Sequence, residues 1–170
     1  MIELKKIFSE CFVDTLLVRL IVGNHTSVHR AGITEVAKGL TEYEEDNFII
    51  GVIDTDKFKR DPPSILAFSE EVANLLQSEG LIIKKVPDCP KYVIRLHPAF
   101  ERWIWRTAQI CKIDTTRYGY NRWQDLKKIA KTEDVYDNIN LVSFIKEVIE
   151  ANPPAIQTLR YWLNKANNEN

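Results

Sequence analysis

The segment FIIGVIDTDKFKRDPP, residues 48–63, decides the fold of this 170-residue chain. Its first part, residues 48–53, is a continuous apolar run, which is typical of a parallel strand buried on both faces of a sheet. Asp54 and Asp56 follow directly, and in extended backbone they would lie on the same side, about 7 Å apart along the chain. Two carboxylates so placed repel each other unless a positive charge lies between them. The segment therefore predicts a central strand with an acidic group at its carboxyl end.

Around this strand, the chain alternates between strand and helix patterns. Before it, the sequence predicts strands at 2–8 and 27–32 and helices at 13–23 and 33–46. After it, the sequence predicts a helix at 64–80 and strands at 81–88 and 91–98. This order favours an α/β fold: a Rossmann-like, mostly parallel sheet flanked by helices, over residues 1–98. Residues 99–170 show only helical periodicity, interrupted at 114–120, 134–138 and 152–154. We expect them to form an α-helical extension packed on the core as one compact unit.

Composition limits the classes of partner. The formal net charge is -1, so the chain has no general attraction to polyanions, and contact with nucleic acid requires local basic patches. The N-terminal residues do not resemble a secretory signal, and no apolar stretch reaches the roughly 18 residues of a membrane span. Three widely spaced cysteines fit reduced thiols. These features predict a cytoplasmic protein without a membrane segment.

The acidic residues follow strands that end at one edge of the predicted sheet. Glu10 follows the first strand, whereas Asp54 and Asp56 follow the third. Ligands of open parallel sheets bind beyond the carboxyl ends of the strands. A hard dication with oxygen ligands, such as Mg²⁺, would relieve the repulsion and leave positions for a phosphate. The alternative is that these acids form turns and helix caps, which is common at strand ends.

Three stretches together resemble the Toprim domain, in particular the Toprim-like proteins of bacterial phage-defence loci, the RloB and overcoming-lysogenization groups. They are FSECFVDTLLVRLI (8–21), GVIDTD (51–56) and HPAFERWIW (97–105), so the resemblance spans about residues 1–106. The family's first strand ends in Glu-Gly, with an acidic residue three positions after the glycine, and its third carries Asp-x-Asp. A later strand of the RloB branch ends in a Pro, a Phe and a Glu-x-Trp. The corresponding residues here are Glu10, Asp14, Asp54, Asp56, Pro98, Phe100, Glu101 and Trp103.

The resemblance implies roles for the acidic residues. Glu10 would act as general acid/base or as a metal ligand, and Asp54 and Asp56 would hold Mg²⁺ or Mn²⁺. Asp14 would either bind the metal or lie in the first turn of a helix, where the helix dipole favours an anion. Glu101 would either complete the acidic cluster or pair with an arginine such as Arg102 or Arg106.

Basic and aromatic residues provide candidate contacts to a substrate. Lys57, Lys59 and Arg60 directly follow the acidic pair, where they would either meet phosphates or form a solvated loop. Gly32 resembles the family's second-strand glycine, at which a helix N-terminus presents backbone amides to an anion. Five aromatic residues suit either base stacking or, more in keeping with aromatics generally, packing of the extension; they are Trp103, Trp105, Tyr118, Tyr120 and Trp123.

One departure from the family pattern separates two hypotheses. Cys11 stands where the family has the glycine that lets backbone approach a phosphate closely. The leading hypothesis is Mg²⁺-dependent phosphodiester hydrolysis or transfer on nucleic acid, in phage defence or mobile-element biology. The second is a non-catalytic Toprim-derived module, monomeric or oligomeric, that binds a nucleotide, a nucleic acid or a partner protein of a defence system. A phosphatase of haloacid-dehalogenase type is disfavoured, because its Asp-x-Asp follows the first strand.

Overall fold

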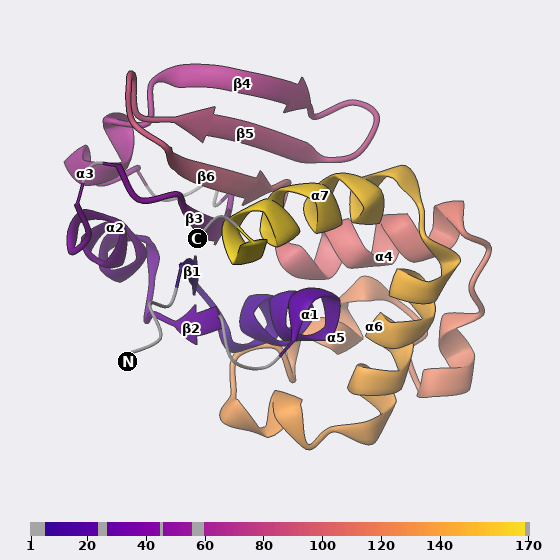
Figure 1. The fold of residues 1–170 in the computed structure, drawn as a ribbon. Coiled ribbons are helices and arrows are strands. Elements are labelled where there is room, and N and C mark those ends of the chain that lie inside the picture. The colour runs from indigo at the N-terminus through magenta and orange to yellow at the C-terminus, as the bar shows by residue number, and fades with distance from the viewer. Residues whose placement is uncertain (1–5, 24–26, 45, 56–59, 169–170) are drawn as a thin grey trace.

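A six-stranded sheet forms the centre of the structure, a computed structural model that describes residues 6–23, 27–44, 46–55 and 60–168. The strands are β1 (Ile7–Ser9), β2 (Ser27–His29), β3 (Ile49–Asp54), β4 (Glu70–Leu75), β5 (Leu81–Lys85) and β6 (Lys91–Leu96), in the order β2-β1-β3-β6-β5-β4 (Figure 1). Neighbours among β2, β1, β3 and β6 pair in parallel, whereas β5 and β4 are antiparallel. The predicted α/β fold with a mostly parallel sheet is therefore confirmed.

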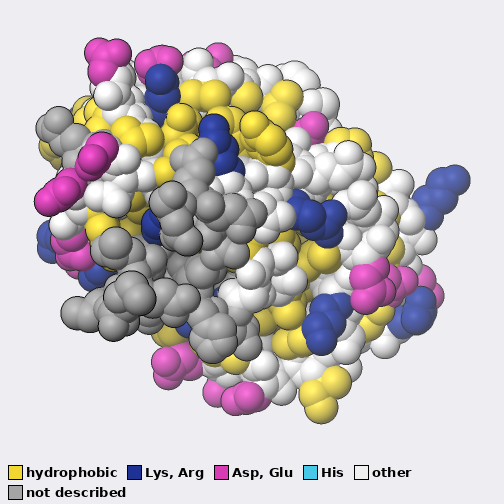
Figure 2. Space-filling view, viewed as in Figure 1, with side chains coloured by type: hydrophobic (Ala, Val, Ile, Leu, Met, Phe, Trp, Pro, Cys, Tyr) yellow, Lys and Arg dark blue, Asp and Glu magenta, His cyan; other side chains and the backbone are white. Residues whose placement is uncertain are grey.

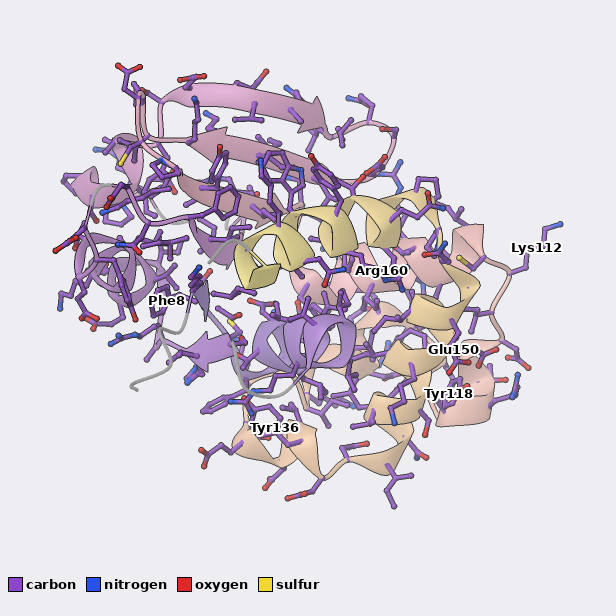
Figure 3. The ribbon with its side chains drawn as sticks, in the orientation of Figure 1. Phe8, Lys112, Tyr118, Tyr136, Glu150 and Arg160 are labelled. Carbon is purple, nitrogen blue, oxygen red and sulfur yellow. The ribbon has the colours of Figure 1, made fainter. Side chains whose placement is uncertain are left out.

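Helices cover both faces of this sheet. They are α1 (Phe12–Val22), α2 (Ile33–Thr41), α3 (Pro63–Leu66), α4 (Phe100–Ile110), α5 (Trp123–Lys127), α6 (Ile139–Ala151) and α7 (Pro154–Asn168), with 3₁₀ turns at Thr115–Tyr118 and Glu133–Tyr136. One face packs on α2 and α3, and the other on α1 and the C-terminal helices (Figure 1). Phe8 lies on the α2 face, while Tyr118 and Tyr136 lie among the C-terminal elements (Figure 3). The all-apolar run of β3 follows from this, because both its faces are buried.

The predicted helix at 64–80 is wrong. Only α3 forms there, and after a turn the chain becomes β4, an edge strand paired with β5. Ile65 and Phe68 of the segment reach the α2 face, whereas Ala73 and Leu75 pack against the opposite cluster. The segment has so few apolar residues that their spacing matches the helical period of 3.6 and the strand period of 2 equally well. Pairing with β5 selects the strand. The strict strand–helix alternation therefore ends at β3, and a β-hairpin replaces the third helical crossover.

The C-terminal helices share one hydrophobic core with the sheet. Trp103 of α4, Phe144 of α6 and Leu163 of α7 are buried in the same cluster as Ile50 and Val52 of β3. The Trp103 indole also donates to the Glu79 carbonyl at 2.9 Å, so its polar edge is satisfied. Burial of each large side chain contributes on the order of 1.5–3 kcal/mol. This joint core fixes the extension against the sheet edge where β1 and β3 end.

The described surface carries both signs of charge. Lysine, arginine, aspartate and glutamate side chains are interspersed on the face in Figure 2, in keeping with the net charge of -1. Among the described helices, none is long and apolar enough to cross a membrane. Any concentration of charge of one sign must therefore be local. Acidic residues are concentrated in this way at the edge beyond β1 and β3.

Candidate functional site

Two acidic residues meet where β1 and β3 end. The strands are neighbours in register, with Ser9 opposite Val52, so the residues that follow them leave the sheet together. The Asp54 amide donates to a carboxylate oxygen of Glu10 at 3.0 Å, and the Glu10 amide donates to the Val52 carbonyl at 3.0 Å. The side chain of Glu10 is thus held across the end of β3.

Asp54 is oriented from the other side by helix α4. Its Oδ1 accepts a hydrogen bond from the Phe100 amide at 2.9 Å. Phe100 is the first residue of α4, and the preceding Ala99 has no side chain able to cap the helix. Asp54 therefore caps α4 from the sheet, and the positive end of the helix dipole favours its negative charge. The resulting orientation fixes one carboxylate oxygen.

Asp14 is the most unusual side chain of the site. It lies in the first turn of α1 with 0% of its surface exposed, and neither carboxylate oxygen has a hydrogen-bond partner among the described residues. Burial raises the pKa of Asp14 well above its usual range, and the charges of Asp54, Glu10 and Glu101 raise it further. The nearby backbone of Cys11 lowers the pKa of Asp14 in part, although it makes no hydrogen bond of acceptable geometry to the carboxylate. Such a group is costly to bury as an anion, so its charge is neutralised either by a proton or by a cation.

Cys11 joins Asp14 and Asp54 in the only group of described residues with the spacing of metal ligands. One ligand atom from each of the three lies within 4.8 Å of the others. Cys11 is the N-cap of α1, with φ -117° and ψ 161°, which is extended backbone open to any residue. A cysteine at this position therefore does not strain the backbone. Burial raises the pKa of the Cys11 thiol, and the surrounding acids raise it further, so the thiol is a poor nucleophile without a cation.

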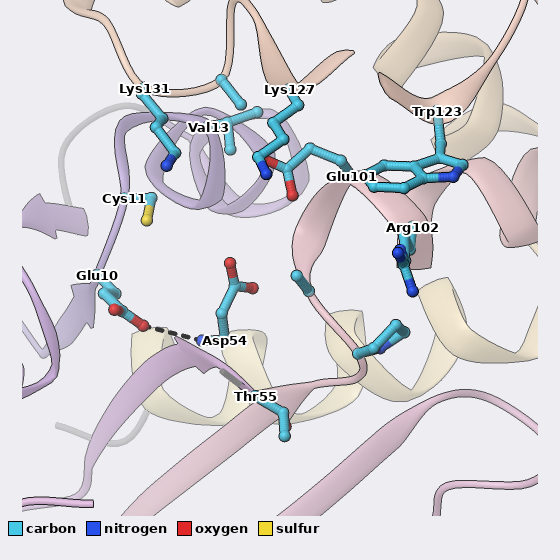
Figure 4. A pocket seen from close by; sticks show the side chains of 13 residues that line it. Glu10, Cys11, Val13, Asp54, Thr55, Glu101, Arg102, Trp123, Lys127 and Lys131 are labelled. Atoms are coloured by element: carbon cyan, nitrogen blue, oxygen red, sulfur yellow. Dashed lines mark hydrogen bonds between the residues drawn. The ribbon is translucent and has the colours of Figure 1, made fainter. Parts of the chain in front are cut away.

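A pocket of about 360 Å³ opens above these residues. Glu10, Cys11 and Asp54 line its floor, and Arg102, Lys127 and Lys131 line the side contributed by α4, α5 and the turn after it. Figure 4 shows Lys127 and Lys131 reaching from above toward the space over Asp54 and Cys11. Trp123 stands beside them, with the Arg102 guanidinium 4.2 Å from its ring centre. The pocket therefore combines an acidic floor with a basic wall.

The other predicted site residues divide into those outside the described residues and those away from this pocket. Asp56, Lys57 and Lys59 lie outside the described residues. Arg60 is exposed and is not among the residues that line the pocket. Gly32 is the N-cap of α2 at φ 97°, and its amide donates to the Arg30 carbonyl at 2.8 Å, so this amide is already engaged.

Glu101 faces the pocket, and the two arginines proposed as its partners contact other groups. It lines the wall beside Lys127 in Figure 4. Arg102 stacks on Trp123, and Arg106 donates to the Gln77 carbonyl at 3.0 Å. Of the two uses considered for Glu101, this placement favours membership of the acidic cluster.

Sequence reasoning missed the basic wall. Lys127 and Lys131 follow a break in helical periodicity and belong to no recognisable motif. Four of the five candidate aromatics pack within the extension, but Trp123 lines the pocket, so packing does not account for all of them. The only sequence signal is the spacing of two lysines by four residues, which places them one turn apart if the helix continues.

Comparisons of the chain with protein-family models, with curated proteins and with solved structures found no match.

Proposed function

We propose that this protein is a divalent-cation-dependent enzyme of phosphodiester hydrolysis or transfer, acting on nucleic acid by Toprim-type chemistry. The observation that carries the proposal is Asp14, a wholly buried carboxylate without a hydrogen-bond partner among the described residues, next to Asp54, which lines the floor of the pocket. A cation there would remove the cost of burying the charge. The resemblance to the Toprim domain names Mg²⁺ or Mn²⁺ as the cation.

The donor set fits a divalent cation. Asp14 and Asp54 supply carboxylate oxygens at suitable spacing, and Glu10 lies at the same strand end, hydrogen-bonded to the Asp54 amide. A bound cation would neutralise these carboxylates and stabilise charge that develops on a transferred phosphoryl group. Asp54 would be oriented by the α4 amide, and Glu10 by the end of β3, so both are positioned before substrate arrives.

The basic wall supports an anionic substrate. Acidic residues alone would repel a phosphate, but Lys127, Lys131 and Arg102 face the same pocket. Lysine binds phosphate as a point charge, and arginine binds it with a planar fork. The two lysines would therefore hold the non-bridging oxygens of a phosphodiester while Glu10 moves a proton to or from the attacking or leaving oxygen. Trp123 offers a ring edge at the same wall for the attached nucleotide.

Cleavage assays with Glu10→Gln and Asp54→Asn test the proposal. Purified protein is incubated with Mg²⁺ or Mn²⁺ and single- or double-stranded DNA or RNA. We expect metal-dependent cleavage that falls roughly 100-fold or more in each variant, because each change removes a ligand or a proton-transfer group. Asp137→Asn, an exposed carboxylate away from the pocket, removes the same charge and serves as the control. Full cleavage by both site variants would refute the proposal.

Binding without turnover would indicate the non-catalytic module instead. Cys11 in place of the Toprim glycine suggests such a module, but the extended backbone of Cys11 leaves the strand end undistorted. Titration of a labelled oligonucleotide alongside the cleavage assay distinguishes the two functions, because the module retains affinity and releases no product.

A further inference from the structure

We infer that Cys11 is itself a ligand of the cation, and that the site therefore selects a thiophilic divalent cation of the Zn²⁺ class over Mg²⁺. This inference rests on the proposed function only in placing a cation at the same residues. The Toprim-type resemblance implies ligands that are all oxygen, whereas the chain places a sulfur beside two of them. The identity of the ion follows from this difference.

The sulfur has the position of a ligand. Cys11 Sγ, an Asp14 oxygen and an Asp54 oxygen lie within 4.8 Å of one another. Adjacent ligand atoms of a tetrahedral zinc site are roughly 3.5 Å apart, given Zn–S of about 2.3 Å and Zn–O of about 2.0–2.2 Å. Small side-chain shifts on cation binding would bring the three ligand atoms to this spacing. Figure 4 shows the sulfur turned toward Asp54 and the pocket.

A second observation points to the same place independently of the cysteine. Asp14 is completely buried, and both its oxygens are without hydrogen-bond partners among the described residues. A cation shared with the neighbouring Cys11 and Asp54 would balance the charge of this carboxylate. The cation would thus contact Asp14 and Cys11 at once.

The chemistry of the donors decides which cation fits. Mg²⁺ requires oxygen ligands in near-octahedral geometry and gives up water reluctantly. Zn²⁺ and Co²⁺ accept a mixed set of sulfur and carboxylate oxygens at four-coordinate sites. A cysteine at this position therefore adds affinity for these ions and none for Mg²⁺. None of the three cysteines is in a disulfide, so Cys11 is available in its reduced form.

Titration with CoCl₂ tests the inference directly, because a cobalt–thiolate bond produces a charge-transfer band in the near ultraviolet. We expect the band in the wild type and its loss in Cys11→Ser. Serine is a favoured N-cap, so the variant should keep α1 intact. Cys111→Ser is the matched control, since Cys111 is another partly buried free thiol and is not one of the pocket residues. ZnCl₂ should displace Co²⁺ from the wild type, and Cys11→Ser should weaken Zn²⁺ on the order of tenfold or more with no change for MgCl₂.

The outcomes separate this inference from the proposed function. Co²⁺ binding without the band, or a band that persists in Cys11→Ser, would overturn the assignment of Cys11 while leaving a cation-dependent enzyme intact. Full cleavage by Glu10→Gln and Asp54→Asn would overturn the proposed function even if the band were present. A protein that binds no Co²⁺ would also overturn this inference, whereas the proposed function would fail only if Mg²⁺ and Mn²⁺ supported no cleavage either.

Discussion

Replacement of Asp14 by asparagine should have opposite effects on stability and on cation binding. The substitution keeps the shape of the side chain and removes its ability to ionise. In the wild type, this buried carboxyl has no hydrogen-bond partner within the described part of the chain, and it lies near Asp54, Glu10 and Glu101. Without a cation, Asp14→Asn should therefore unfold at a higher temperature than the wild type. With a cation, the order should reverse.

The expected size follows from burial. An unsatisfied buried polar group costs about 1–3 kcal/mol, and more if it is charged. We expect the cation-free variant to be more stable by about 1–3 kcal/mol at neutral pH, which corresponds to about 2–12 °C in Tm for a chain of this size. At a cation concentration of 100 times Kd, the wild type would gain about 2.7 kcal/mol. The variant, which lacks a ligand, should gain far less.

The difference should also depend on pH. Because burial raises the pKa of Asp14 above its unfolded value, the folded chain holds this proton more tightly than the unfolded chain. The corresponding stability is fully present below the unfolded pKa and is lost as pH rises toward the folded pKa. The advantage of Asp14→Asn should thus be small near pH 4 and grow toward neutral pH, by no more than about 1.4 kcal/mol per pH unit.

Thermal unfolding after EDTA treatment, repeated with added MnCl₂ or ZnCl₂ and across pH 4–8, measures all three effects. Asp137→Asn, which removes an exposed carboxyl, should show neither the stabilisation nor the loss of the cation response. A cation-free Asp14→Asn that is less stable than the wild type would refute the reasoning, because it would mean that the carboxylate is satisfied in the fold. An equal cation response in both proteins would exclude Asp14 as a ligand.

Three further predictions concern the basic wall and the core. In fluorescence anisotropy, the double variant Lys127→Ala/Lys131→Ala should bind a labelled oligonucleotide more weakly, on the order of tenfold or more, since each lysine contributes a charge-assisted contact. Lys128 is exposed and does not line the pocket, so Lys128→Ala should bind normally. Trp103→Ala should cost about 3–5 kcal/mol of unfolding free energy in urea titrations, because it empties a fully buried site; a loss below about 1 kcal/mol would contradict its place in the shared core. Gly51→Ala should cost about 1–3 kcal/mol in the same assay, since an added Cβ would lie 2.8 Å from a side chain of α2.

The central part of the fold could be predicted from the sequence because its signals are local. The apolar run of β3 indicates burial on both faces, and the carboxyl ends of neighbouring parallel strands must meet, so Glu10 and Asp54 were expected at one edge. β4 could not be predicted, since its short apolar pattern fits helix and strand alike and only pairing with β5 selects the strand. Long-range pairing leaves little trace in a short segment.

The site was predictable on its acidic side and unpredictable on its basic side. The acidic residues Glu10 and Asp54 follow β1 and β3, and the ends of these neighbouring parallel strands lie at the same edge of the sheet. Lys127 and Lys131, by contrast, reach the pocket through the irregular course of residues 111–131, which depends on how α4 and α6 pack. The complete burial of Asp14 was likewise unexpected, because an acid in the first turn of a helix is normally solvated.

The packing of α1 has a consequence for the far end of the chain. Asp14 lies in the first turn of α1, and α1 also packs against α7. When a cation occupies the site, α1 loses freedom to shift, and α7 loses it with α1. Amide hydrogens along α7 should then exchange more slowly with deuterium, so that the last helix reports occupancy of a centre to which it contributes no ligand.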